Sequence, residues 1–276
     1  MFKIDTHQHA WNLSEVEYGW LKPEYTAFYG NFTPDLLGPQ VKAAGVDYTV
    51  MVQAANSYED TASMLLHASY NDWIAGVVGW VNLLDPQEAG KRLDMYSKGP
   101  YFKGMRHLIH DEPDPDWVIQ PIVIESLKIL AGHNLPFDVV AVYPNHIKHV
   151  PTLAEKVPNL RMVIDHLGKP PIGKDDTVWF DQMKAAAQSP NVYAKLSGQF
   201  DNPAWSVSDI QPYADHVLEQ FGADRVLFGS DWPVALMGGT YASVWANTQA
   251  LIANCTPAEK EAILGGTAIR FYDLKV

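Results

Sequence analysis

Two histidines near the start of the sequence, His7 and His9, are the first residues whose type and spacing suggest chemistry. They occur in the segment Asp5-Thr6-His7-Gln8-His9, at the end of the apolar run Phe2–Thr6. Side chains of a strand alternate between its two faces, so residues at i and i+2 point the same way. Two solvated loop histidines would show the same spacing, and the H-x-H pattern alone leaves both interpretations open. At the end of a buried strand, the pair favours a functional site.

Further ionisable groups follow two apolar runs in the second half of the chain. Asp165 and His166 come directly after the run Leu160–Ile164, and Asp231 follows the run Arg225–Gly229. Burying a carboxylate or an imidazole at the end of a core strand costs free energy unless the group has a partner. One such residue could be a structural hydrogen-bonding group. Three strands that end this way favour a shared active site.

Eight short apolar runs could hold these residues at their ends, and their nearly continuous hydrophobicity suits parallel strands covered on both faces. The runs are Phe2–Thr6, Tyr48–Val52, Ile74–Val81, Phe102–Arg106, Phe137–Val142, Leu160–Ile164, Val192–Leu196 and Arg225–Gly229. Helical patterns lie between several of them, at Asp60–Tyr70, Ile122–His133, Phe180–Gln188, Ile210–Phe221 and Tyr241–Ala253.

This alternation predicts a parallel α/β sheet, either open or closed into a barrel. No G-x-G-x-x-G motif follows the first run, which disfavours an open sheet that binds a dinucleotide. A (β/α)8 barrel uses about 250 residues. We therefore predict a single TIM-type (β/α)8 barrel domain over residues 1–276.

Composition and charge limit the class of protein. With 47% hydrophobic and 19% charged residues, the chain is typical of a globular enzyme. Its net charge of −12 argues against nucleic acid or an anionic membrane as a partner. Cys255 is the only cysteine, so no intrachain disulfide forms, and we interpret it as structural. No apolar run has the length of a membrane span or a signal core. We expect a cytoplasmic enzyme, and leave monomer and homo-oligomer both open.

Four longer segments extend the pattern of polar residues at strand ends. They are Lys103-Gly104-Met105-Arg106-His107, Ile164-Asp165-His166-Leu167-Gly168-Lys169-Pro170, Lys195-Leu196-Ser197-Gly198 and Phe228-Gly229-Ser230-Asp231-Trp232-Pro233. With the H-x-H motif, they resemble the sugar-lactonase branch of the amidohydrolase superfamily. That branch holds L-fuconolactonases and L-rhamnonolactonases, with 2-pyrone-4,6-dicarboxylate lactonase as a more distant relative. The resemblance runs from Asp5 to Tyr272 and implies a barrel hydrolase that opens an aldonolactone to its hydroxy acid.

The resemblance also implies roles for individual residues. Asp231 would be the base that activates water, and Arg106 would stabilise charge on the carbonyl oxygen. The histidines His7, His9 and His166 would complete the catalytic group. We expect substrate contacts from Gln53, His107, Tyr143 and Trp232. Lys195 lies further back on its strand, and we interpret it as structural.

One departure from the superfamily pattern concerns metal. Metal-dependent members usually have a Lys or His ligand at the end of strand four or five, whereas here strand five ends Val142-Tyr143-Pro144 and strand four ends in Arg106. We therefore expect that no cofactor is required. One divalent ion such as Zn²⁺ would be optional, held by His7, His9 and Asp231.

Two alternatives remain. The first is a metal-dependent amidohydrolase or decarboxylase on the same barrel. The second is a non-catalytic barrel that binds a sugar or acts as a scaffold, which the intact H-x-H motif and Asp231 disfavour.

Overall fold

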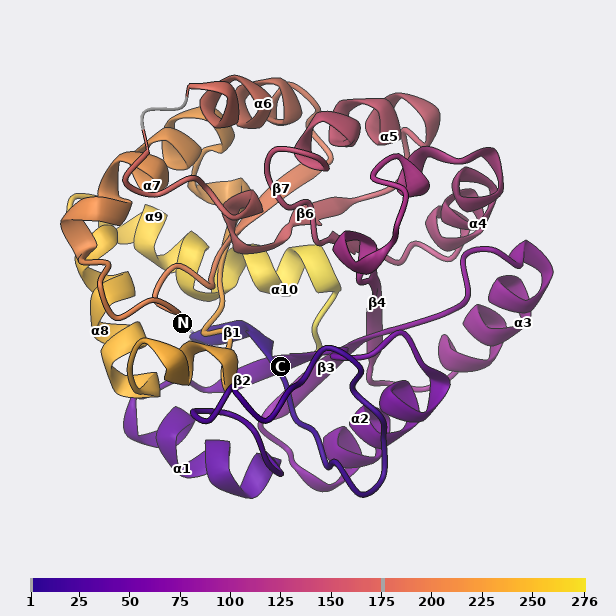
Figure 1. Ribbon diagram of the computed structural model, residues 1–276, viewed down its shortest axis with the longest axis horizontal. Helices are drawn as coiled ribbons and strands as arrows, with labels where there is room; N and C mark the ends of the chain where they lie inside the picture. Colours follow the sequence, from indigo (N-terminus) through magenta and orange to yellow (C-terminus); the bar gives the residue numbers. More distant parts are fainter. Residues whose placement is uncertain (1, 175–176) are drawn as a thin grey trace.

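The computed structural model describes residues 2–174 and 177–276, and its centre is a ring of eight parallel strands (Figure 1). The strands pair in chain order, each with the next. They are β1 Ile4–Gln8, β2 Tyr48–Val52, β3 Ile74–Gly79, β4 Phe102–His107, β5 Phe137–Val139, β6 Met162–Ile164, β7 Val192–Leu196 and β8 Val226–Phe228. Their buried, mainly apolar residues are those of the eight predicted runs.

The ring is closed by contacts between the first and last strands. The amide of Asp231 donates to the carbonyl of His7 at 2.7 Å, and the amide of His9 donates to the carbonyl of Trp232 at 2.8 Å. The Thr6 hydroxyl donates to the carbonyl of Phe228 at 2.5 Å. We call this junction of β1 and β8, with the residues just after them, the seam. The predicted (β/α)8 barrel is confirmed.

Helices form the layer outside the strands (Figure 1). They are α1 Pro34–Ala43, α2 Tyr58–Tyr70, α3 Pro86–Tyr96, α4 Pro121–Gly132, α5 Val150–Lys156, α6 Val178–Ala187, α7 Val207–Phe221, α8 Tyr241–Leu251, α9 Pro257–Glu261 and α10 Thr267–Tyr272. Capping side chains set the first residues of several helices. The Ser57 side chain accepts from the amide of Asp60 at the start of α2, and a capping box precedes α8. Within the described residues, no helix is long and apolar enough to cross a membrane.

The C-terminal helix α10 covers one end of the barrel. Its Phe271 ring packs on Tyr193 of β7 with centroids 4.7 Å apart. The Tyr272 hydroxyl donates to the Asp138 carboxylate inside the barrel at 2.8 Å. These contacts fill the end where the strands begin. The open mouth therefore lies at the end where the strands finish, which is where barrel enzymes place their active sites.

Strand β5 is shorter than predicted, because it ends at Val139 rather than Val142. Beyond it the backbone makes tight local bonds, from the amide of Ala141 to the carbonyl of Val139 and from Val142 to Val140. The chain leaves the barrel wall there, so Tyr143 is not a strand-end residue.

Candidate active site

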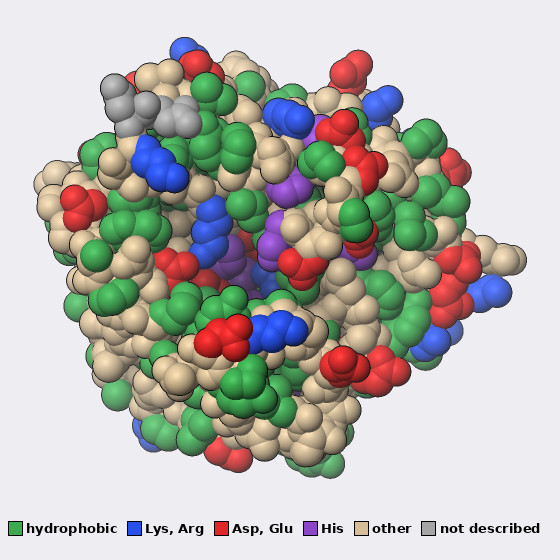
Figure 2. All heavy atoms as spheres, viewed as in Figure 1, with side chains coloured by type: hydrophobic (Ala, Val, Ile, Leu, Met, Phe, Trp, Pro, Cys, Tyr) green, Lys and Arg blue, Asp and Glu red, His purple; other side chains and the backbone are tan. Residues whose placement is uncertain are grey.

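A pocket of about 290 Å³ opens at the carboxyl ends of the strands. Figure 2 shows histidine, basic and acidic side chains gathered in the hollow at the centre of this face. The pocket is lined by His9, Trp20, Ala54, Arg106, Leu108, His110, Val140, Val142, His166, Lys169, Asp231 and Val234. Four of the five expected catalytic residues are in this set. The fifth, His7, lies at its floor and is fully buried.

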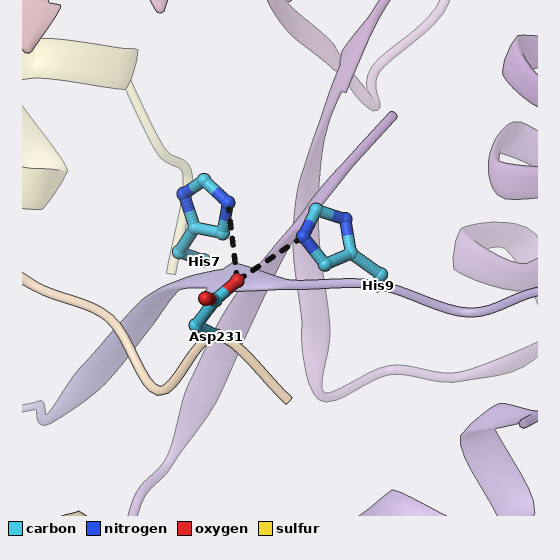
Figure 3. Close-up of side chains that lie close together, drawn as sticks. All are labelled: His7, His9 and Asp231. Atoms are coloured by element: carbon cyan, nitrogen blue, oxygen red, sulfur yellow. Dashed lines mark ion pairs between the residues drawn. The ribbon is translucent and has the colours of Figure 1, made fainter. Parts of the chain in front are cut away.

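Asp231 is the centre of the polar group. Its Oδ1 lies 3.4 Å from Nε2 of His9 and 3.8 Å from Nε2 of His7 (Figure 3). Nε2 of His166 lies 3.9 Å from the same oxygen. The seam hydrogen bonds bring Asp231 and the H-x-H pair together, although they come from opposite ends of the chain. The arrangement places one carboxylate among three imidazoles.

Hydrogen bonds to the far ring nitrogens orient the two H-x-H side chains. His9 Nδ1 donates to the carbonyl of Val52 at 2.7 Å, which leaves Nε2 facing Asp231. Nδ1 of His7 lies 3.2 Å from Nζ of Lys195 and 3.3 Å from Oδ1 of Asp165. Contacts of this kind on one ring nitrogen fix the plane of the imidazole.

A buried ionic network lies beneath His7. Lys195 Nζ donates to Asp138 at 2.6 Å and lies 3.0 Å from Asp165. Arg106 Nη1 donates to the other oxygen of Asp165 at 3.2 Å. Burial acts to raise the pKa of Asp165, but Lys195, His7 and Arg106 hold that pKa well below its usual range. Lys195 and Asp165 thus support the site from below. From the sequence alone, Lys195 is interpreted as structural, and Asp165 is singled out only because it directly precedes His166.

Burial and charge set the protonation of the pocket residues. Burial lowers the pKa of His166 to about 3, so its ring is neutral at physiological pH. Burial also acts to raise the pKa of Asp231, but His166, the other imidazoles and Lys169 hold it well below its usual range. Asp231 is therefore ionised at physiological pH.

The turn after β6 has an unusual backbone. His166, Leu167, Gly168 and Lys169 all have φ between 51° and 69°, a region costly for residues with a Cβ. Two side chains hold this left-handed turn: Gln199 Nε2 donates to the His166 carbonyl at 2.9 Å, and Trp179 Nε1 donates to the Leu167 carbonyl at 2.8 Å. Four left-handed residues in succession thus carry both His166 and Lys169 into the pocket wall.

The structure places the four expected substrate-binding residues outside the pocket. Gln53 is buried, and its side chain donates to the Arg106 carbonyl at 3.2 Å, so it supports Arg106. Tyr143 is half-buried beside a separate hollow of about 330 Å³, because β5 ends early. Neither side chain lines the pocket that holds Asp231.

His107 faces away from the pocket because neighbouring strand residues face opposite sides, and Trp232 follows Asp231, whose backbone is left-handed with φ 61°. His107 accepts from Trp80 Nε1 at 2.9 Å, pairs with Glu112 at 2.7 Å and stacks on Trp117. Trp232 is 1% exposed and belongs to an apolar cluster with Leu37, Val41, Val46 and Tyr241. Both side chains pack behind the residues that line the pocket, and their contact with substrate stays a prediction.

Eight of the residues that line the pocket were not expected, and three of them, Lys169, His110 and Trp20, carry polar groups. Lys169 donates to Asp201 at 2.8 Å, and Asp201 outweighs burial to raise the pKa of this lysine, which stays charged. His110 lines the same pocket. Trp20 donates from Nε1 to the Ala54 carbonyl at 2.7 Å and forms an apolar wall with Leu108 and three valines. Lys169 belongs to a quoted motif, but its sequence position does not reveal the left-handed turn that brings it inward.

Two groups of side chains in the described residues have the composition of a metal site, and they share His7: one adds His9 and Asp231, the other Asp165 and His166. Ligand atoms of His7, His9 and Asp231 all lie within 4.8 Å of one another, and two imidazoles with a carboxylate suit Zn²⁺. His9 and Asp231 fit an ion well. Nε2 of His7 is already contacted by Arg106 Nη1 at 3.1 Å.

Comparisons with known proteins agree with this geometry. A family model described as Amidohydrolase matches residues 4–274. The L-fucono-1,5-lactonase of Burkholderia ambifaria is 34% identical over 98% of this chain and 95% of that protein. The L-fucono-1,5-lactonase of Burkholderia multivorans is 30% identical over 99% and 96%. A crystal structure of a Burkholderia multivorans amidohydrolase with bound Zn matches with a TM-score of 0.92 and 30% identity, covering 100% of both chains. The resemblance predicted from the strand-end segments is confirmed.

Proposed function

This chain belongs to the amidohydrolase family, and we propose that it is a lactonase that opens a sugar-derived aldonolactone to the hydroxy acid. The observation that carries the proposal is the ionised Asp231 among three imidazoles, beside Arg106, in a pocket that holds one small ring. The relatives named as L-fucono-1,5-lactonases support the choice of a lactone.

The reaction needs a base and a cation. Asp231 takes a proton from water as the water oxygen attacks the lactone carbonyl carbon. Arg106 stabilises the negative charge that develops on the carbonyl oxygen, and its buried Nε–H has no partner among the described residues. A donor of this kind typically contributes about 3 kcal/mol to the transition state. The ring carbon–oxygen bond then breaks, and Asp231 returns the proton to the leaving alkoxide.

A metal ion is not required in this proposal. If one binds, His7, His9 and Asp231 would hold it, and it would supply Lewis acidity near the carbonyl. Arg106 already provides a fixed positive charge at this position.

The pocket wall indicates which lactone fits. Trp20, Leu108 and Val234 offer apolar surface, while Lys169 and His110 offer hydrogen-bonding groups. A sugar lactone that ends in a methyl group presents one apolar end and several hydroxyls. We therefore propose a 6-deoxy aldonolactone as substrate.

A matched substrate pair tests the proposal. L-Fucono-1,5-lactone and L-galactono-1,5-lactone differ by one hydroxyl at the terminal carbon. We expect hydrolysis of both, followed by a pH indicator, with kcat/KM about tenfold higher for the methyl compound. Absence of acid release from every member of an aldonolactone panel would contradict the lactonase.

Chelation separates the lactonase from its alternative. Thorough chelator treatment should leave most of the lactonase rate. Loss of the rate by orders of magnitude, with recovery on adding Zn²⁺ back, would instead favour a metal-dependent amidohydrolase or decarboxylase.

A further inference from the structure

The contact between Arg106 and His7 has a consequence for metal binding. The Arg106 guanidinium is 4% exposed and is anchored on several sides. Nη1 lies 3.1 Å from His7 Nε2 and donates to Asp165 at 3.2 Å, and Nη2 donates to the carbonyl of Gln53. These fixed partners hold the positive charge against the one nitrogen of His7 that faces Asp231.

The partners of His7 decide which ring nitrogen carries its proton. A guanidinium only donates hydrogen bonds, and an ionised carboxylate only accepts them. Arg106 therefore requires a lone pair on Nε2. Nδ1 lies 3.3 Å from Oδ1 of Asp165 and 3.2 Å from Nζ of Lys195. Because a neutral imidazole has only one lone pair, the Arg106 contact leaves the proton on Nδ1, on the side of Asp165. The lone pair of Nε2 is the same electron pair that a metal ion would need.

His9 gives the contrasting case. Its Nδ1 donates to the Val52 carbonyl at 2.7 Å, and its Nε2 faces Asp231 at 3.4 Å with no cationic side chain recorded against it among the described residues. His9 and Asp231 are thus ready to bind an ion, whereas His7 is not.

We propose that Arg106 and a divalent cation compete for Nε2 of His7. In the metal-free protein, the guanidinium is the resident cation of the site. An ion that uses all three ligands must displace Arg106 from His7. This competition weakens metal binding at a site whose side-chain types would otherwise suit Zn²⁺.

Zn²⁺ affinity, measured by calorimetry and by competition with a chromophoric chelator, tests the proposal on the full chain. Arg106→Met removes the competitor, and Asp165 keeps Lys195 as a partner at 3.0 Å. Because Zn²⁺ no longer has to displace a charged hydrogen-bond donor from His7, we expect it to bind about tenfold or more tightly. An unchanged or weakened affinity would overturn the proposal.

Lys169→Met is the matched control. This lysine also brings a positive charge to the pocket, but its Nζ donates to Asp201 and the Gly198 carbonyl and not to a histidine. We expect its loss to tighten Zn²⁺ binding by less than about threefold, because only a longer-range repulsion is removed. Equal tightening in both variants would show that general charge, not the His7 lone pair, limits binding, and would overturn the competition.

A second measurement uses the unmodified protein. Magnetic resonance of isotope-labelled imidazole nitrogens reports which nitrogen of each ring is protonated. In metal-free protein we expect His7 to carry its proton on Nδ1 and to accept at Nε2. A proton on Nε2 of His7 would overturn the proposal even if Arg106→Met failed to fold. Neither test uses lactone hydrolysis, so the two proposals can fail separately.

Discussion

Oδ1 of Asp231 lies 3.4 to 3.9 Å from three imidazole nitrogens. In the proposed mechanism the carboxylate, and not one of these imidazoles, takes the proton from water. Asp231→Asn keeps the shape and removes the base. We expect kcat to fall by about 10²- to 10⁴-fold, with the same circular dichroism spectrum and melting temperature. Retention of more than a few per cent of the rate would assign the base to a histidine.

Lys169 is a pocket cation that does not contact the expected metal ligands. We expect Lys169→Met to raise KM for the lactone about tenfold through loss of a charged hydrogen bond, while kcat changes less. The matched control is Lys174→Met, since Lys174 borders the neighbouring hollow but not the pocket. Steady-state kinetics measures both. A similar rise of KM in the two variants would show that Lys169 does not contact the substrate.

At the scale of elements, the turns after the strands set the positions of the site residues. Gly198 follows β7 with φ +66°, and a Cβ there would lie 2.6 Å from His166 Nδ1 and 3.0 Å from Asp231 Oδ2. We therefore expect Gly198→Ala to displace the catalytic group and to lower kcat/KM by about 100-fold or more, as small misplacements do.

Gly173→Ala separates backbone strain from this steric effect. Gly173 also has a positive φ, +76°, but a Cβ there would meet nothing within 4 Å. Both variants incur about 1 to 2 kcal/mol of strain, which denaturant unfolding measures. Only Gly198→Ala should lose activity, and equal losses would contradict the placement of Gly198 against the site.

Strand β4 turns Arg106 into the barrel and His107 toward the helices. His107→Leu leaves Trp80 Nε1 and the Glu112 carboxylate without their partner. We expect the free energy of unfolding to fall by about 1 to 3 kcal/mol, measured with denaturant, and KM to stay unchanged. A large rise of KM without loss of stability would indicate that His107 contacts the substrate.

These elements also show what sequence can and cannot predict. Apolar runs located the eight strands, and polar residues just after them located His7, His9, His166 and Asp231 near one another. Because neighbouring strand residues face opposite sides, placing Arg106 inside the barrel would have predicted that His107 points outward. The early end of β5, which moves Tyr143 away, depends on backbone bonds that no motif encodes. The left-handed turn that brings Lys169 inward is held by Gln199 and Trp179, which are distant in the sequence.

At the scale of the whole molecule, net charge distinguishes classes of substrate. The chain carries −12, and a field of this sign slows the approach of anions in a salt-dependent way. A lactone is neutral, so we expect kcat/KM to change less than about twofold between roughly 20 and 300 mM NaCl, since screening acts only on charged pairs. A marked rise with salt, measured under conditions limited by kcat/KM, would indicate an anionic substrate such as that of a decarboxylase.

The position of the site on the seam ties activity to the order in which the chain is made. His7 and His9 leave the ribosome before the other strands of the barrel, and Asp231 follows only after seven strands have been made. Until β8 arrives, β1 is an open edge strand with unpaired backbone groups, which is a hazard for association with other chains. When Asp231 bonds to the His7 carbonyl, the same contact removes the exposed edge and completes the catalytic group. An incomplete barrel therefore has no partial activity. The chain becomes active only when β8 has joined β1 and the unpaired edge strand is covered.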